Sequence, residues 1–161
     1  MDAAEEIVAG CYQSLNYFVI SGVRIGVKEV DLLAINLNPI GQISERLHVE
    51  VQVSANPVGV LRTKAGLGKT GHDPRKSARE YVEKKFLDPK VERRVKEIFC
   101  GQPYSKVFVH GKLNKLEQLE EIQKMGVKCI PIGQLVKKSS ANPVASLKRT
   151  LSIREVVNLG M

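Results

Sequence analysis

Two short apolar segments each carry an acidic residue that could take part in metal chemistry. Asp31 lies within residues 28–36, and Glu50 lies within residues 47–54. Both segments are rich in apolar and β-branched residues and end at turn-forming residues, which predicts two strands. A carboxylate in such a strand is costly to bury unless it is paired, hydrogen-bonded or bound to a metal. Because the two strands follow one another along the chain, their carboxylates can converge on one divalent cation, which is the basis of metal-assisted phosphodiester hydrolysis.

Each acid also has a purely structural interpretation. Asp31 can cap a turn or pair with a nearby cation, Lys28 or Arg24. Glu50 can face solvent from an edge strand, together with the polar residues at every second position beside it. The alternation of side chains along the strand is compatible with a site and with a solvated face.

The remaining periodicities predict the elements that must position these acids. Residues 2–15 repeat their apolar side chains with a helical period, and Asp2 is a suitable N-cap. A strand is expected over residues 17–20, with Ser21-Gly22 as a turn or bulge and residues 23–27 as its continuation or partner; residues 36–45 are expected to form a loop.

The second half of the chain predicts alternating helices and strands. Ser77 and Glu80 have the spacing of a capping box, which predicts a helix to about Leu87. Further helices are expected over residues 90–100, from Asn114 to Gly126 and over 141–158, and strands over 104–110 and 127–132. This order predicts an α/β fold in which three meandering antiparallel strands are followed by a parallel crossover, giving a mixed central sheet flanked by helices.

The length and composition indicate one globular domain. A chain of 161 residues with 43% hydrophobic content can form a single core. It has no apolar run of about 18 residues and no basic-then-apolar N-terminal segment, so we expect neither a membrane span nor a signal peptide, and a cytoplasmic location. Cys11, Cys100 and Cys129 are odd in number and far apart, which predicts buried free thiols rather than disulfides or a zinc site.

The basic charge and one long loop suggest a polyanionic partner. The formal net charge is +8, which favours a polyanionic partner such as nucleic acid. Residues 55–76 are rich in Gly, Pro and basic residues and are expected to be a long loop that contacts phosphates. The residues expected to make these contacts are Arg62, Lys64, Lys69, Arg75 and Lys76. Gly66 to Thr70 is not a nucleotide-binding loop, because the first glycine of that motif would fall at Thr63.

The element order and the acids together resemble the restriction-endonuclease-like PD-(D/E)xK nuclease superfamily, in particular its Holliday-junction-resolvase-like and Mrr-like members. The resemblance covers roughly residues 2–110, leaving 111–161 as a C-terminal extension of a single domain. It implies an αβββαβ core, with Asp31 as the first acid, Glu50 as the second and Glu5 as the helix acid, Glu6 being the fallback. These residues would hold Mg²⁺ or Mn²⁺, assisted by the Val51 carbonyl, and DNA would be the substrate.

The sequence departs from this superfamily at Gln52. Most members carry Lys at this position, where it orients the attacking water and stabilises negative charge, although some members carry Glu-x-Gln. A neutral amide can only donate or accept hydrogen bonds, so the missing cation would have to come from the following loop or helix. The candidates are Lys64, Lys76, Arg79 and Lys85.

Three functions therefore stay open from the sequence. The resemblance implies a metal-dependent DNA endonuclease whose catalytic residues are Glu5, Asp31, Glu50 and Gln52. The loss of the lysine is equally typical of a non-catalytic nucleic-acid-binding or assembly module with the same fold. A protein-interaction domain with a basic face is the third. Members of the superfamily are often dimers, so the resemblance also implies a homodimer as one state of the chain.

Overall fold

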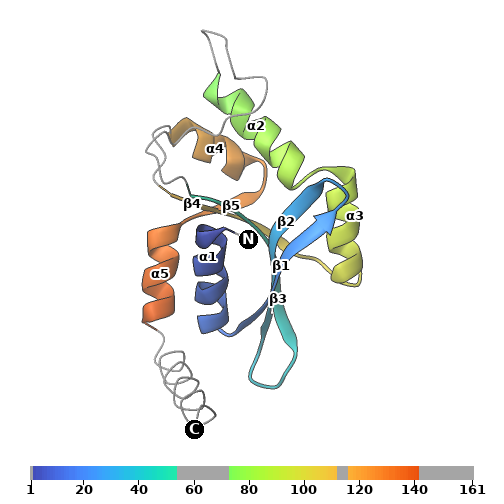
Figure 1. The fold of residues 1–161 in the computed structure, drawn as a ribbon, viewed down its shortest axis with the longest axis vertical. Coiled ribbons are helices and arrows are strands. Elements are labelled where there is room, and N and C mark those ends of the chain that lie inside the picture. The colour runs from blue at the N-terminus through green and yellow to red at the C-terminus, as the bar shows by residue number, and fades with distance from the viewer. Residues whose placement is uncertain (1, 54–72, 112–115, 142–161) are drawn as a thin grey trace.

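The computed structural model describes residues 2–53, 73–111 and 116–141. Within these ranges a five-stranded sheet has the order β1-β2-β3-β4-β5. The strands β1 (Tyr17–Ile25), β2 (Lys28–Leu37) and β3 (Ile43–Gln52) form an antiparallel meander, and β4 (Ser105–His110) and β5 (Val127–Pro131) continue it in parallel with β3. The α/β class and the mixed sheet flanked by helices, both predicted from the sequence, are confirmed (Figure 1).

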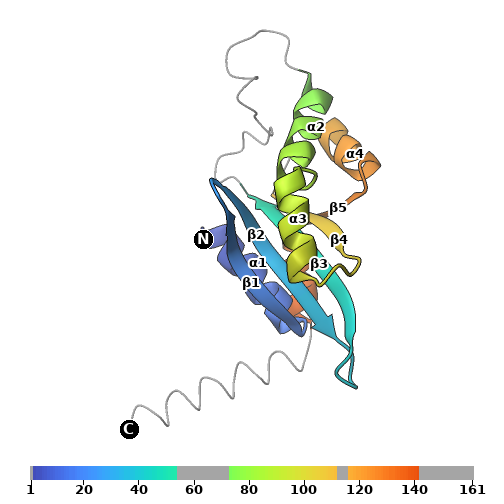
Figure 2. The ribbon, with the colours of Figure 1, turned by 90° about the vertical axis from the view of Figure 1, so that its right-hand side faces the viewer.

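Helices cover both faces of the sheet. On one face α1 (Ala3–Ser14) and α5 (Ile132–Ser140) lie side by side (Figure 1). On the other face lie α2 (Pro74–Lys85), α3 (Pro89–Ile98) and α4 (Leu116–Lys124), with α2 and α4 in contact and α3 beside β2 (Figure 2). Parallel strands joined through helices must have both faces covered, which this arrangement achieves.

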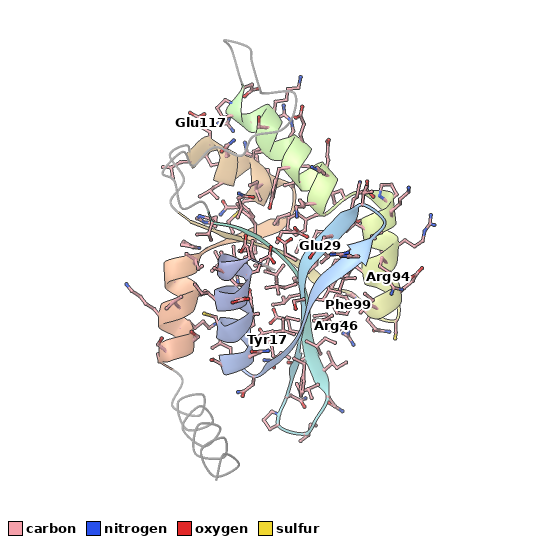
Figure 3. The ribbon with its side chains drawn as sticks, in the orientation of Figure 1. Tyr17, Glu29, Arg46, Arg94, Phe99 and Glu117 are labelled. Carbon is pink, nitrogen blue, oxygen red and sulfur yellow. The ribbon has the colours of Figure 1, made fainter. Side chains whose placement is uncertain are left out.

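The alternation of β3 assigns its side chains to the two faces. Val49 and Val51 pack with α1 and α5, whereas His48 and Glu50 point toward the face of α2. A separate apolar cluster joins α3 to β2, and its Phe99 lies between that helix and the sheet, while Arg94 projects from the outer side of α3 (Figure 3). The face covered by α2 therefore carries both polar and apolar side chains in its interior.

The start of α2 differs from the prediction. The helix begins at Pro74, and the Asp73 side chain accepts the Arg75 backbone N–H at 3.0 Å as its N-cap. Ser77 is therefore a buried residue inside the helix, and the predicted capping box with Glu80 is wrong. An Asp-Pro pair ends one segment and begins a helix equally well, because proline fits the first helical position.

The boundaries of several other elements also differ from the predictions. β1 is continuous through Gly22, whose φ of +64° is of the kind that glycine adopts readily. β3 begins at Ile43 rather than at residue 47, because the Asn38 side chain closes a short loop by accepting the Gln42 N–H at 2.8 Å. The helix α5 was not predicted, and Cys100 is exposed rather than buried. The predicted cap at Asn114 and nearly all of the helix at 141–158 lie outside the described residues.

Candidate functional site

Asp31 and Glu50 lie opposite one another on the same face of the sheet. In the antiparallel ladder Leu33 pairs with His48, so Asp31, two residues before Leu33, and Glu50, two residues after His48, lie opposite one another on that face. One ammonium group, that of Lys85, contacts both carboxylates. The convergence of the two acids, expected from consecutive strands, is therefore present in the fold.

Asp31 is held by the backbone of the neighbouring strand. Its Oδ2 accepts the Val51 N–H at 2.8 Å, just beyond the last ladder pair of β2 and β3, and the residue is 7% exposed. Burial raises the pKa of Asp31 to about 6, the charge of Glu50 adds to this rise, and the charge of Lys85 opposes it. The Asp31 carboxyl is therefore protonated at a higher pH than an ordinary aspartate and is ionised above about pH 6.

Glu50 lies on a central strand and is fully buried. The interpretation of Glu50 as a solvated residue on an edge strand is therefore wrong. Its Oε1 lies 2.9 Å from His48 Nε2. Burial lowers the pKa of His48 to about 3, so its imidazole is neutral near pH 7 and Nε2–H donates to the carboxylate. Burial also raises the pKa of Glu50, against the opposing charge of Lys85.

Lys85 is the one of the four cation candidates that pairs with both acids within the described residues. Its Nζ lies 2.6 Å from Glu50 Oε2 and 3.2 Å from Asp31 Oδ1. Burial by itself would lower the pKa of Lys85, but the charges of Glu50 and Asp31 outweigh burial and raise it. Of the other predicted candidates, Arg79 pairs with Glu121 on α4 at 3.0 Å.

Of the two remaining candidates only Lys76 lies within the described residues, and no ion pair joins it to the acids there. Lys76 is exposed in the first turn of α2, and Lys64 lies outside the ranges that the structure describes. Lys85 was one of four candidates that the sequence could not separate. Lys85 is distinguished from the other candidates by its position in the last turn of α2, where this helix lies over the polar face of β3.

Aromatic side chains anchor the C-terminal half of α2 over the site. Phe86 is fully buried, and its ring centroid lies 4.7 Å from that of His48. The Tyr81 ring packs against Phe108 at 5.2 Å. Its hydroxyl is buried without a hydrogen-bond partner within the described part of the chain, and burial raises its pKa well above the usual range, with a contribution from the Glu50 charge. Sequence reasoning assigned no role to Tyr81.

Glu5 and Gln52 do not contact the acid pair. Glu5 is the third residue of α1, and its carboxylate accepts the Asp2 backbone N–H at 3.2 Å in a capping box. Burial raises the pKa of Glu5, and the charge of Asp31 contributes, so the two carboxylates are close enough to interact through space. Gln52 is exposed at the end of β3, and no hydrogen bond joins its side chain to the pair among the described residues.

The donor set suits a hard cation, but only in part. Among residues 2–53, 73–111 and 116–141, no group of three or more His, Cys, Asp or Glu is arranged to hold a metal ion. Asp31 and Glu50 nevertheless direct one oxygen each at a single cationic nitrogen. Carboxylate oxygens are the ligands that Mg²⁺ and Mn²⁺ prefer, so these two residues fit such an ion while Glu5 is engaged elsewhere.

Most of the predicted phosphate-contacting residues cannot be placed. Arg62, Lys64 and Lys69 lie outside the described residues. Arg75 is in the first turn of α2 and pairs with Glu120 on α4 at 3.4 Å, which partly neutralises its charge.

A separate groove lies away from the acid pair. It has a volume of about 660 Å³ between α1, α5 and the first residues of β4 and β5, and Tyr12, Lys128 and Lys138 are among the residues that line it. Asp31, Glu50 and Lys85 are not among its lining residues. The sequence did not indicate this groove, since its walls come from segments far apart in the chain.

Comparisons with known proteins support the fold alone. No family model and no curated protein matches the chain. A crystal structure described as that of a "Protein of Unknown Function AF1548" is similar, with a TM-score of 0.53 and 18% sequence identity over 84% of this chain. The match covers 65% of that protein's length, so the present chain spans less than two thirds of it. No helix within the described ranges is long and apolar enough to cross a membrane.

Proposed function

We propose that the protein is a metal-dependent DNA endonuclease related to the PD-(D/E)xK superfamily. The observation that carries the proposal is the convergence of two buried carboxylates, Asp31 and Glu50, on one ammonium group at a single face of the sheet. Buried acids that share a face and a cation are costly to assemble, and such arrangements are concentrated at functional sites.

The residues have distinct roles in this proposal. Asp31 and Glu50 would hold Mg²⁺ or Mn²⁺, and the ion would act as a Lewis acid on the scissile phosphate and lower the pKa of water. Lys85 would stabilise negative charge that develops on the phosphate, the role that Lys at position 52 has in most relatives. His48 would orient Glu50 through the hydrogen bond at 2.9 Å.

The substrate class follows from charge. A net charge of +8 favours a polyanion, and a phosphodiester backbone is the substrate on which a two-carboxylate metal site would act. The basic segment at 62–76 would hold phosphates without reading base sequence.

A second candidate is a non-catalytic nucleic-acid-binding or assembly module with the same fold. The observation that favours it is that Lys85 already pairs with both carboxylates, an arrangement that also suits a structural ion pair. Gln52, which is exposed and apart from the pair, is consistent with the loss of a catalytic residue.

Cleavage assays distinguish the two candidates. Purified protein is incubated with supercoiled plasmid, branched DNA and single-stranded DNA in Mg²⁺, in Mn²⁺ or in chelator. If the protein is an endonuclease, it cleaves DNA in the presence of the metal, and chelator abolishes the cleavage. Asp31→Asn also abolishes it, because the ion loses a ligand while the volume of the side chain is kept. Glu29→Gln is the matched control, since Glu29 is an exposed acid two residues away on the same strand.

If the protein is a non-catalytic module, it binds DNA, but in any metal its cleavage does not exceed that of Asp31→Asn. Cleavage that is equal in wild type and Asp31→Asn would contradict the endonuclease proposal and indicate a different site or a contaminating enzyme.

A further inference from the structure

We infer that Lys85 is an internal counter-ion that competes with a divalent metal for the same two carboxylate oxygens, so that metal binding displaces its ammonium group from the acid pair. The inference rests on the proposed function for the identity of the metal site. It adds a device by which this chain regulates the loading of that site.

Each carboxylate has one oxygen fixed by the protein and one oxygen turned toward Lys85. Asp31 Oδ2 accepts the Val51 N–H at 2.8 Å, and Glu50 Oε1 is 2.9 Å from His48 Nε2. The remaining oxygens, Asp31 Oδ1 and Glu50 Oε2, lie 3.2 Å and 2.6 Å from Lys85 Nζ. A metal ion that bridges the pair would therefore use the oxygens that the ammonium contacts.

The two cations cannot share this position. Mg²⁺ binds carboxylate oxygen at about 2.0–2.2 Å and requires near-octahedral ligands around it. An ammonium held within hydrogen-bond distance of the same two oxygens occupies the space those ligands need. The repulsion between a divalent and a monovalent cation at such a separation is also large away from bulk water. The ion and Lys85 Nζ must therefore exclude one another.

Lys85 can leave the pair, whereas the acids cannot. Its side chain is 27% exposed, while the side chains of Asp31 and Glu50 are 9% and 0% exposed. Lys85 is in the last turn of α2, and its flexible stem lets the charged group swing toward solvent without movement of the helix. Once displaced, the ammonium would remain beside the site, where an anionic phosphate would be its next partner.

Metal affinity tests the competition without reference to activity. Mn²⁺ binding is measured by isothermal titration calorimetry for wild type, Lys85→Met and Lys84→Met. Lys84 is the neighbouring lysine of the same helix and is exposed, so its variant has the same change in net charge. We expect Lys85→Met to bind Mn²⁺ at least about tenfold more tightly than wild type, and Lys84→Met to differ from wild type by less than about twofold.

A second measurement on the wild type covers the case in which Lys85→Met does not fold. The Cε resonance of Lys85 is followed by NMR as diamagnetic Mg²⁺ is added. We expect it to shift in proportion to the Mg²⁺ bound, because the ammonium loses both carboxylate partners. The Lys84 resonance should remain in place.

Two results would overturn the inference alone: Mn²⁺ binding by Lys85→Met that is no tighter than by wild type, or saturation with Mg²⁺ that leaves the Lys85 resonance unchanged. Failure of the endonuclease proposal is distinguishable from either. Tighter Mn²⁺ binding by Lys85→Met in a protein that never cleaves DNA would retain the competition and remove the activity. Metal-dependent cleavage by wild type, together with an Mn²⁺ affinity that is the same in Lys85→Met as in wild type, would retain the activity and remove the competition. An absence of Mn²⁺ binding by wild type and variants alike overturns the inference.

Discussion

Four titratable side chains share one network, in which Asp31, Glu50 and Lys85 shift one another's pKa values and Asp31 and Lys85 also act on His48. Asp31 and Glu50 are acids whose pKa values burial raises, and the neutral His48 and charged Lys85 are their partners. With both acids ionised, one ammonium does not balance two carboxylates, which is consistent with the raised pKa values of both acids. A second positive charge at the pair is what the proposed metal ion would supply.

His48 should remain neutral far below the usual pH. Its pKa falls from the ordinary histidine value of 6.5 to about 3 in the fold, so between these values the folded chain binds fewer protons than the unfolded chain. The contribution of His48 to the free energy of unfolding is complete above pH 6.5 and is lost as the pH falls toward 3, with a slope of at most about 1.4 kcal/mol per pH unit. We expect the ring resonances of His48 in an NMR titration to stay constant from pH 8 to about 5.

The raised pKa of Asp31 changes the free energy of unfolding with pH in the opposite direction between pH 3.8 and about 6. Comparison of wild type with His48→Gln separates the pH dependence due to His48 from that due to Asp31. The stability of the variant should depend less steeply on pH on the acid side than that of wild type. A His48 resonance that titrates near pH 6.5 would contradict the prediction.

Lys85 should matter more than Gln52 for cleavage. In the proposed endonuclease, Lys85→Met would remove a positive charge that acts on the scissile phosphate, so we expect a loss of about 10²–10³-fold in the rate of plasmid cleavage under saturating Mn²⁺. Gln52→Ala removes an exposed amide that does not contact the acid pair, so its loss should be smaller. The rates are measured under single-turnover conditions. A larger loss in Gln52→Ala than in Lys85→Met would return the catalytic role to position 52.

At the scale of elements, α2 brings a cation from a different part of the chain to the acids. Phe86, Val82 and Ala78 are fully buried along its inner side, and Lys85 projects toward the sheet from the same turn as Phe86. Apolar packing of the helix therefore sets the distance between Lys85 and the carboxylates. The Asp73 cap and Pro74 fix where the helix begins, which in turn fixes which of its basic residues faces the pair.

Truncation of Phe86 should destabilise the protein and loosen the site together. Phe86→Ala leaves a cavity beneath α2 beside the His48 ring, and we expect the free energy of unfolding to fall by about 3–5 kcal/mol in urea denaturation. Ile7→Ala, which shortens an apolar side chain that is 51% exposed on α1, is the control and should change stability by less than about 0.5 kcal/mol. Equal effects of the two substitutions would exclude Phe86 as an anchor of α2.

At the scale of the whole molecule, some of the positive charge is already paired with acidic side chains. The chain has a net charge of +8, yet some of its basic residues are engaged in ion pairs, such as Arg75 with Glu120 and Arg79 with Glu121. Lys85 is engaged with the acid pair. Unpaired basic residues elsewhere must therefore supply the attraction for DNA that the proposed function requires.

DNA binding should depend steeply on salt. Each phosphate that the protein neutralises contributes about −0.9 to the slope of log K against log salt concentration on duplex DNA. We expect the quadruple change of Arg62, Lys64, Lys69 and Arg75 to Gln to flatten the slope measured by fluorescence anisotropy. Replacement of Lys90, Arg93, Arg94 and Lys96 on α3 by Gln removes the same charge and is the control. An equal flattening in both variants would remove the 62–76 segment as a specific phosphate contact.

The sequence by itself determined the α/β class, most of the elements other than α5, and the two strands that carry the acids. Strand periodicity and β-branched residues are local properties, so β2 and β3 could be recognised around Asp31 and Glu50 without knowledge of the fold. Their convergence could be expected because consecutive strands joined by a short connection are usually neighbours in a sheet. The exact start of α2 did not follow, since Asp73-Pro74 and Ser77 are both acceptable helix starts, and packing against the sheet selected the first.

Only the tertiary structure decided that Lys85 is the cation of the acid pair. Three of the four basic candidates, Lys76, Arg79 and Lys85, lie on α2. They differ by the direction in which each faces once α2 packs on the sheet, which depends on contacts such as that of Phe86 with His48. The burial of Glu50 was likewise undecided, because alternation along a strand fixes which residues share a face but not which face is covered by helices. Long-range packing covers that face, and it converts two acids of ordinary strand pattern into a buried pair with one shared counter-ion.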